Sequence, residues 1–221
     1  MRRSRLLKKS VPLALILLSF LINIAEAKVV DEHVYIVPAG KIDGKILENI
    51  KSDMPGRWPV SMNVEIFSEE TIPESAHNLS SGQYEAGVVL YDIARRITIV
   101  PSTERVLVVT DADLYVPDMD FVFGLADEKK GMSIISVARL ENGFYGLKPD
   151  ERLLRERVLK EALHEVAHSR GIDHCRDPKC VMYFSNTLAD TDRKKTAFCH
   201  DCNRKLYQMY GAPLFKTPWG K

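Results

Sequence analysis

The 221-residue sequence contains no internal repeat and no low-complexity tract, which excludes a repeat array and a fibrous protein. It also has no apolar run long enough for a membrane-spanning helix, which needs roughly 20 residues. The longest run, residues 11–24, has 14 residues and includes Pro12 and Asn23. Neither sign of charge dominates, with 31 basic and 30 acidic residues. With 45% apolar and 28% charged residues, the composition is that of a globular protein with one main core.

The first 27 residues differ in pattern from the rest of the sequence. Basic residues come first (Arg2, Arg3, Arg5, Lys8 and Lys9), the apolar run follows, and Ala25-Glu26-Ala27 ends the segment. This order is typical of a secretory signal peptide, so we predict cleavage after Ala27 and a secreted or extracytoplasmic protein. One alternative is an uncleaved N-terminal anchor, which would hold the protein at a membrane. Another is a wrongly assigned start codon, which would make the protein cytoplasmic.

Removal of this segment changes the overall charge. Residues 1–27 carry five basic groups and one acidic group, so the formal charge of +1 becomes about −3 for residues 28–221. A mildly acidic protein lacks the basic surface that binds nucleic acid. We therefore expect no nucleic-acid partner, and we expect residues 28–221 to form a single, monomeric domain.

Apolar periodicity predicts a mixed α/β domain, a mixed sheet with helices. The predicted strands are residues 34–37, 60–67, 105–110, 121–126 and 132–140, and the predicted helices are residues 44–54, 83–97 and 151–170. Asp43 and Asp150 are the expected N-caps of the first and last helix. Residues 105–110 are almost entirely apolar or β-branched, which predicts a strand buried on both faces. Residues 127–131 are the expected turn between the last two strands, as in an antiparallel hairpin at a sheet edge.

The last predicted helix contains His164 and His168, with Glu165 directly after the first histidine. Histidines four residues apart lie about one helical turn from each other on the same face, where both can bind a single metal ion. Glu165 then stands beside the metal without binding it, in the position of a general base. Gly171 permits the positive φ angle that ends a helix abruptly, so the returning chain can bring His174 to the same ion. A chance cluster at a helix end is the alternative.

Three neutral imidazoles leave a zinc ion its full double charge and one open coordination position. Water bound there can ionise near neutral pH and attack a carbonyl carbon. The motif therefore predicts a zinc-dependent peptidase, in which Glu165 takes a proton from water and passes it to the departing amine. The alternative is a zinc-binding or scaffold protein of the cell envelope without useful turnover, and the intact Glu165 argues against it.

All four cysteines of the sequence follow the histidine motif. They form two closely spaced pairs, Cys175 with Cys180 and Cys199 with Cys202. A tetrahedral structural zinc site requires two such pairs, so we predict a second zinc ion. Two disulfide bonds are the alternative, which an oxidising compartment would favour. The spacing of the second pair also occurs in redox motifs, but no thioredoxin-like strand and helix pattern surrounds it.

Several short motifs follow one another in this part of the sequence: HExxHxxGxxHC at residues 164–175, CVM at 180–182, FSN at 184–186 and CxxC at 199–202. This succession resembles the archaemetzincin family of metallopeptidases, most strongly over residues 150–210. The resemblance implies a compact metzincin-like fold in which a mixed sheet with helices sits above a cleft. It also implies one catalytic zinc ion held by the histidines, one structural zinc ion held by the cysteines, and a Met-turn at Met182 beneath the catalytic metal.

Three further side chains have two interpretations each. Glu161, one turn before Glu165, is expected to be solvated or salt-bridged rather than a second catalytic carboxylate. His200 is expected to be exposed rather than a substitute metal ligand. Tyr183 either donates its hydroxyl to the oxyanion or points into the core. If residues 132–140 form an edge strand above the cleft, a peptide substrate can add to that strand through main-chain hydrogen bonds.

Overall fold

A computed structural model describes residues 32–211 of the chain. The strands are β1 (Glu32–Ala39), β2 (Met62–Ile66), β3 (His77–Asn78), β4 (Gln83–Glu85), β5 (Glu104–Thr110), β6 (Leu114–Val116), β7 (Met119–Val122), β8 (Gly124–Asp127) and β9 (Met132–Ser136). The α-helices are α1 (Gly44–Asp53), α2 (Ala86–Ala94), α3 (Glu151–His168), α4 (Leu188–Arg193) and α5 (His200–Met209). Short 3-10 helices are η2 (Pro55–Arg57), η3 (Glu74–Ala76), η4 (Ala138–Leu140) and η5 (Asn142–Tyr145).

The mixed α/β class predicted from the sequence is confirmed. The predicted signal segment, residues 1–27, lies outside the described residues. Between residues 32 and 211, none of the helices has both the length and the apolar content needed to cross a membrane.

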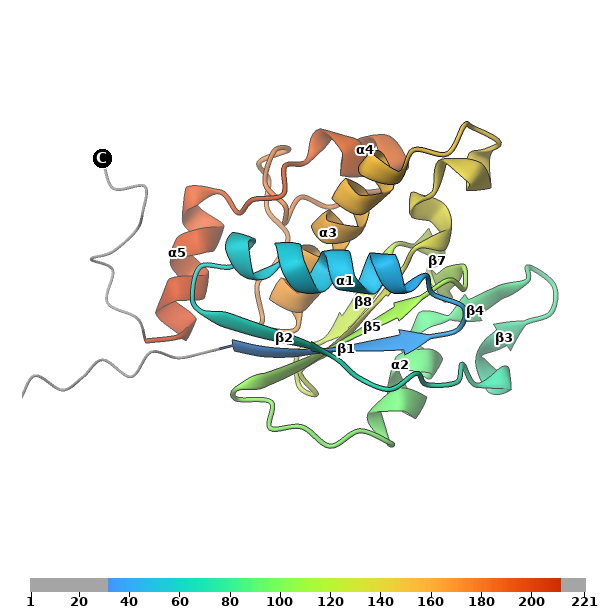
Figure 1. Cartoon of the computed structure of the whole chain (residues 1–221), viewed down its shortest axis with the longest axis horizontal. Coiled ribbons are helices and arrows are strands. Elements are labelled where there is room, and N and C mark those ends of the chain that lie inside the picture. The colour runs from blue at the N-terminus through green and yellow to red at the C-terminus, as the bar shows by residue number, and fades with distance from the viewer. Residues whose placement is uncertain (1–31, 212–221) are drawn as a thin grey trace, which may run out of the picture.

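A five-stranded sheet forms the centre of the structure, in the order β2-β1-β5-β9-β8. Its first four strands are parallel to one another, and β8 runs antiparallel to β9. Helices α1 and α3 cover one face of this sheet and α2 covers the other (Figure 1). The remaining four strands form a separate, smaller sheet in the order β3-β4-β6-β7.

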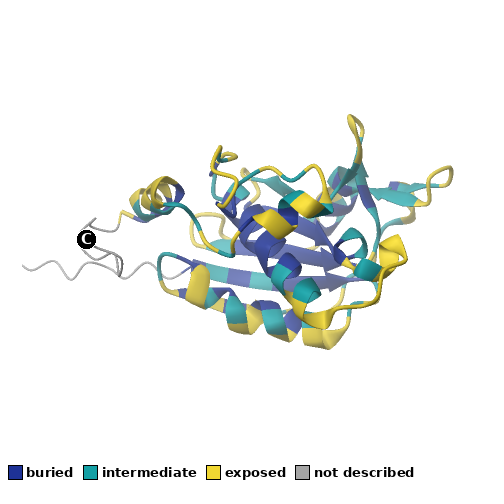
Figure 2. Ribbon diagram, turned by 90° about the horizontal axis from the view of Figure 1, so that it is seen from above, coloured by how far each residue is buried: buried dark blue, intermediate teal, exposed yellow. Residues whose placement is uncertain are grey.

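The central strand β5 separates two hydrophobic cores. Leu107 and Val109 pack on the side of α1 and α3, whereas Val106 and Val108 pack on the side of α2. All four side chains are fully buried, which confirms the prediction of a strand covered on both faces. Figure 2 shows these central strands in dark blue between helices whose outer surfaces are exposed.

Both predicted N-caps are confirmed. The Asp43 carboxylate accepts a hydrogen bond from the Lys45 backbone N–H at 2.9 Å, and Asp150 accepts one from Leu153 at the same distance. These bonds satisfy backbone donors that have no partner inside the first turn of a helix. The helix that carries the histidine motif therefore begins where the sequence predicts it, at Glu151.

Two predicted elements begin or divide elsewhere. The helix predicted over residues 83–97 begins only at Ala86, because the preceding residues pair with β6, with the Tyr84 N–H bonded to the Asp113 carbonyl at 2.8 Å. The strand predicted over residues 121–126 divides at Phe123, where the chain passes from β7 in the small sheet to β8 in the main sheet. Local apolar patterns could not distinguish these cases, since the pairing partners are distant in sequence.

The two edges of the main sheet are formed by β2 and β8. The predicted antiparallel hairpin is present, but β9 lies between β5 and β8, so the prediction of residues 132–140 as an edge strand was wrong. Strand β9 also ends at Ser136, whose hydroxyl accepts a hydrogen bond from the Ala138 N–H at 3.2 Å as the chain turns into η4. The edge strand on this side is therefore β8, and it borders the cleft described below.

Candidate metal centres and cleft

Helix α3 places the histidine motif at the centre of the molecule. Every residue from Arg157 to Ala167 is buried, because the sheet, α1 and α4 surround this part of the helix. The helix ends at His168, and Gly171 turns the chain with a φ angle of +82°. A Cβ atom at this glycine would also lie 2.6 Å from Oε1 of Glu128. The sharp turn predicted after the helix is therefore present and admits only glycine.

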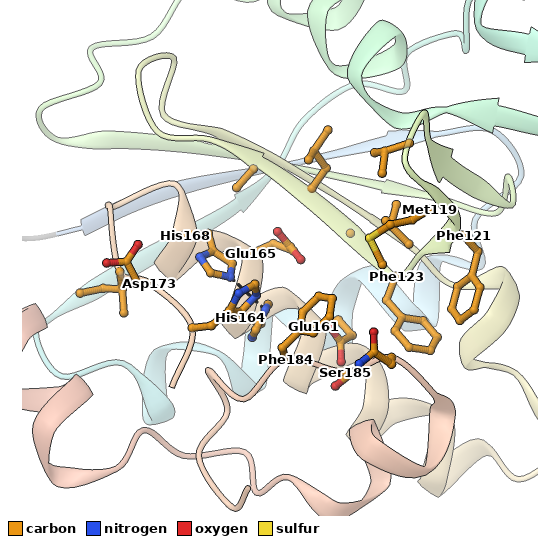
Figure 3. A pocket seen from close by; sticks show the side chains of 18 of the residues that line it. Met119, Phe121, Phe123, Glu161, His164, Glu165, His168, Asp173, Phe184 and Ser185 are labelled. Carbon is orange, nitrogen blue, oxygen red and sulfur yellow. Dashed lines mark hydrogen bonds between the residues drawn. The ribbon is translucent and has the colours of Figure 1, made fainter. Parts of the chain in front are cut away.

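The three histidines of the motif face one another (Figure 3). We call them the histidine cluster, which consists of His164, His168 and His174. One nitrogen of each ring lies within 4.8 Å of the others, and the Nε2 atoms of His164 and His168 are 3.0 Å apart. A tetrahedral zinc site with bonds of about 2.0–2.1 Å has nitrogen–nitrogen distances of about 3.4 Å. The cluster is therefore of the right size and composition to hold zinc.

The protonation states of these imidazoles also suit a metal. Nδ1 of His164 donates a hydrogen bond to the Val181 carbonyl at 2.8 Å, which leaves the lone pair of Nε2 directed at the cluster. Burial lowers the pKa of His164 well below its ordinary value and lowers the pKa of His168 to about 4. Burial also lowers the pKa of His174. All three rings are therefore neutral at neutral pH, which is the form that binds a metal ion.

Glu165 lies between the histidine cluster and the edge strand β8. A Cβ atom at Gly124 would lie 2.5 Å from its Cγ atom and 2.7 Å from Oε1, so the backbone of β8 can approach this carboxyl only at a glycine. Burial, followed by the nearby Glu161 carboxylate, raises the pKa of Glu165 well above its ordinary value. The contact joins residues that are distant in the sequence, and the only local signal of it is a glycine within an apolar strand pattern.

The four cysteines form a second group, the cysteine cluster, which consists of Cys175, Cys180, Cys199 and Cys202. Their Sγ atoms lie within 4.8 Å of one another, and those of Cys175 and Cys199 are 3.7 Å apart. Zinc–sulfur bonds of about 2.3 Å in a tetrahedron give edges of about 3.8 Å, whereas a disulfide bond measures about 2.05 Å. All four residues are free cysteines in the structure. The separation of these Sγ atoms has the size of a tetrahedral metal site.

One short segment contacts both clusters. The carbonyl of Val181 holds His164, and the carbonyl of Met182 accepts a hydrogen bond from the Cys175 N–H at 2.8 Å. Met182 itself is fully buried. His174 and Cys175, which belong to different clusters, are joined by a single peptide bond. Displacement of this segment would therefore disturb both clusters together.

A cleft of about 700 Å³ runs along β8 and contains the histidine cluster and Glu165. Glu161 also lines it, yet is only 2% exposed, and its Oε1 atom lies 3.0 Å from Nζ of Lys194. This residue is therefore salt-bridged, as expected, and buried rather than solvated. Tyr183 lies outside the lining and forms an isolated β-bridge with Cys175. His200 is exposed, as expected.

Comparison with known proteins gives consistent matches over most of the chain. The model of Peptidase family M54 matches residues 26–208. Archaemetzincin from Pyrococcus furiosus is 35% identical over 184 residues, which cover 81% of this chain and 95% of that protein. Archaemetzincin from Methanocaldococcus jannaschii is 36% identical over 175 residues, which cover 79% of this chain and 92% of that protein.

Solved structures of similar proteins share the fold. The zinc-dependent peptidase from Methanocorpusculum labreanum matches with a TM-score of 0.72 and 30% identity, covering 78% of this chain and 99% of that one. Archaemetzincin from Methanopyrus kandleri matches with a TM-score of 0.69 and 33% identity, covering 81% of this chain and 96% of that one.

Proposed function

Because this chain belongs to peptidase family M54, the archaemetzincins, we propose that its histidine cluster holds the catalytic zinc ion and that Glu165 is the general base. The chain is a zinc metallopeptidase, and it acts on peptide or protein substrates. The observation that carries the residue assignment is the convergence of three neutral imidazoles on one point, with a buried carboxyl beside them. Among residues 32–211, two groups of side chains could hold a metal ion, and the histidine cluster is the one made of imidazoles.

The chemistry follows from the position of Glu165. Zinc, when bound, supplies a Lewis acid that polarises the scissile carbonyl and makes water more acidic. Glu165 accepts a proton from the attacking water as the oxygen of that water bonds to the carbonyl carbon. The same carboxyl then donates the proton to the amine nitrogen as the carbon–nitrogen bond breaks, so the residue ends as it began.

We place the substrate backbone along β8. This strand has one unpaired side, borders the cleft and approaches Glu165 at Gly124. Main-chain N–H and C=O groups of an edge strand bind an extended peptide with little dependence on its side chains. The sequence predicted an edge strand at residues 132–140, but the strand at this edge is the neighbouring β8.

We further propose that the cysteine cluster binds a second zinc ion with a structural role. The separation of 3.7 Å between two of its Sγ atoms supports this, as does the availability of four thiol ligands, which fill a tetrahedral site and leave no position for a substrate. Such an ion would hold together the two ends of the segment 175–202, which contains Met182 and α4. The proposed total is therefore two zinc ions per chain.

Export from the cytoplasm remains a proposal that rests on the sequence of residues 1–27. The match to the family model begins at residue 26, so the basic and apolar stretch precedes the matched region. Fractionation of expressing cells, with N-terminal sequencing of the purified protein, tests this point. A mature protein that begins at Lys28 outside the cytoplasm is the expected result, and an intact Met1 on soluble cytoplasmic protein would contradict it.

The residue assignment is tested by Glu165→Gln. We expect at least a 100-fold loss of peptide hydrolysis, about the size of a lost general base, with two zinc ions per chain still present. The matched control is Glu151→Gln, which lies on the same helix but is highly exposed and outside the cleft. Metal analysis and thiol titration before and after chelation should find four thiols that appear only on chelation. Retained hydrolysis in Glu165→Gln would refute its role as the base.

A further inference from the structure

We propose that one half of the cleft binds a substrate side chain with an apolar stem and a cationic tip, namely lysine or arginine, and that Glu161 recognises the tip. This inference rests on the proposed peptidase function and specifies its substrate class. It is carried by three features of the cleft: aromatic walls, open polar atoms at the base, and the sign of the lining charges.

The walls are the first feature. Figure 3 shows the two ends of the cleft, with Asp173 on one side of the histidine cluster and Met119, Phe121 and Phe123 on the other. Phe184 packs against the His174 ring at 4.7 Å between centroids, so it stands directly beside the proposed metal site. Phe123 is 4% exposed. The long methylene stems of lysine and arginine gain free energy when they lie on such apolar surfaces while their charged ends reach a polar partner.

The base of this half is polar. Oε1 of Glu161 accepts a hydrogen bond from the Thr191 hydroxyl at 3.0 Å and pairs with Nζ of Lys194 at the same distance. Both contacts use Oε1, which leaves Oε2 able to accept from a further donor. The hydroxyl of Ser185, which also lines the cleft, is buried and has no hydrogen-bond partner among the described residues. Buried polar atoms are normally paired, so the Ser185 hydroxyl indicates a polar ligand, and Oε2 of Glu161 adds an anionic acceptor beside it.

The charges of the lining favour a cation. The cleft is lined by the carboxylates of Asp118, Asp120, Glu128, Glu161, Glu165 and Asp173. Among the described residues that line it there is no lysine and no arginine. Asp118 and Asp120 belong to the same end as Phe121 and are exposed at the rim. At this end, away from the proposed zinc ion, an acidic substrate side chain would meet repulsion from Asp118, Asp120 and Glu161, whereas a basic one would be attracted.

Two nearby cations do not reverse this balance. Lys194 offsets part of the Glu161 charge, but its ammonium group is fully buried and is not part of the lining. Arg139 stacks over the Phe121 ring at 4.4 Å, yet it makes a two-point ion pair with Asp113 at 2.6 and 2.8 Å. Its charge is therefore already matched by a carboxylate.

The test compares fluorogenic peptides that are identical except at one position, which carries lysine, arginine, norleucine or glutamate. The position is scanned on both sides of the cleaved bond, and kcat/KM is measured with the zinc-loaded enzyme. At one position we expect lysine and arginine to exceed norleucine about tenfold, the contribution of one hydrogen bond to a charged group, and glutamate to fall below norleucine. Glu161→Gln should move the lysine-to-norleucine ratio towards one, whereas Glu151→Gln should preserve it.

Binding gives a second result that does not depend on turnover. Titration calorimetry of the same peptides with zinc-loaded Glu165→Gln should show the same order of affinity. Equal kcat/KM for lysine, norleucine and glutamate at every position would overturn the inference while leaving the peptidase function intact. A lysine preference that survives Glu161→Gln would overturn the role of Glu161. Selective binding without hydrolysis by the wild-type chain would instead refute the proposed function alone.

Discussion

The contact between Gly124 and Glu165 decides how close the proposed base lies to a substrate. The side chain of Glu165 fills the space that a Cβ atom at residue 124 would occupy, with Cγ at 2.5 Å. Because the edge strand also borders the cleft, the same glycine sets the distance between the carboxyl and a peptide that adds to the strand. We therefore regard Gly124 as a positioning residue for Glu165.

Gly124→Ala tests this contact. We expect kcat to fall about 100-fold, because a displacement of the base by about 1 Å has an effect of that size. Zinc content should not change, since the substitution touches no histidine of the cluster. Gly143→Ala is the matched control, as nothing lies within 4 Å of its added Cβ atom. A variant at residue 124 with the kcat of the wild type would show that Glu165 has room to move.

A buried hydrogen-bond chain connects the two ends of the described chain. The Tyr210 hydroxyl donates to Oε2 of Glu32 at 2.6 Å and accepts from Nε1 of Trp58 at 3.1 Å. Glu32 is completely buried and also pairs with Arg170, just beyond the end of α3. Loss of the hydroxyl would leave the Trp58 donor without a partner and remove one of the two hydrogen bonds to Oε2 of Glu32, in a region that excludes water.

For Tyr210→Phe we expect the free energy of unfolding to fall by about 1–3 kcal/mol, the typical effect of leaving buried polar groups unpaired. Urea denaturation followed by tryptophan fluorescence measures it, on protein saturated with zinc. Tyr207→Phe on the same helix is the control, because Tyr207 is not part of this chain of bonds. Equal stability of the two variants would mean that water replaces the Tyr210 hydroxyl.

At the scale of elements, α1 and α3 pack side by side on the main sheet and are joined by an ion pair. The Arg155 guanidinium donates to both carboxylate oxygens of Asp53 at 2.7 Å. Hydrogen bonding from Arg155 lowers the pKa of Asp53. Arg155 is 47% exposed and Asp53 25%, so solvent screens the pair and its contribution is below about 1 kcal/mol.

The stability difference between the wild type and Asp53→Asn should depend on pH. A carboxyl whose pKa is lower in the folded state stabilises that state fully above its unfolded pKa of about 3.9. This stabilisation is lost as the pH falls through the folded pKa. Urea denaturation of both proteins at pH 7 and in acid should therefore show a difference at pH 7 that shrinks as the pH falls below about 3.9. A difference that persists in acid would assign the effect to packing and not to charge.

The short helix α4 shows a sequence signal that was overlooked. Thr187 and Asp190 form a capping box, in which each side chain binds the backbone N–H of the other. The Thr-x-x-Asp pattern is visible in the sequence, but six residues are too few for apolar periodicity to reveal a helix. Tertiary contacts hold α4 in place, chiefly the two-point ion pair between Arg157 and Asp192 at 2.6 and 2.7 Å. The same helix supplies Thr191, whose hydroxyl donates a hydrogen bond to Glu161 of the cleft.

At the scale of the whole molecule, the two clusters are parts of one assembly. The cleft is lined by residues of β8, of α3 and of the segment that follows α3. The cysteine cluster joins residues of that same segment to residues at the start of α5. Because Val181 holds His164 and Met182 holds Cys175, an ion bound by the cysteines would fix the orientation of a histidine ligand. Stability and metal affinity should therefore change together.

Cys202→Ser tests this coupling. We expect zinc content to fall from two ions per chain to one or fewer, and the melting temperature to fall with it. The affinity of the histidine cluster for zinc should decrease at least about tenfold, as occurs when a group that orients a metal ligand is lost. Competition with a chromogenic chelator measures both sites. Two zinc ions with unchanged affinity in this variant would show that the clusters are independent.

The sequence by itself determined the elements whose causes are local. The spacing of His164 and His168, the cap at Asp150 and the turn at Gly171 all act within one helix and its ends, so they could be predicted from neighbouring residues. Strand β5 was equally predictable, because its composition alone requires cover on both faces. The helical spacing also determined that the two histidines point to the same side.

Only the tertiary structure decided which strand lies at the edge, what touches Glu165 and how Glu161 is paired. Strand β8 is outermost because β9 pairs with β5, a choice between partners that local pattern does not encode. Gly124 meets Glu165, and Glu161 meets Lys194, across more than 30 residues of chain, through the packing of α3 against the sheet and α4. Such contacts arise from the fit of surfaces formed by distant segments. Local physics therefore set the proposed metal ligands, and the packing of the fold set the surroundings in which they would act.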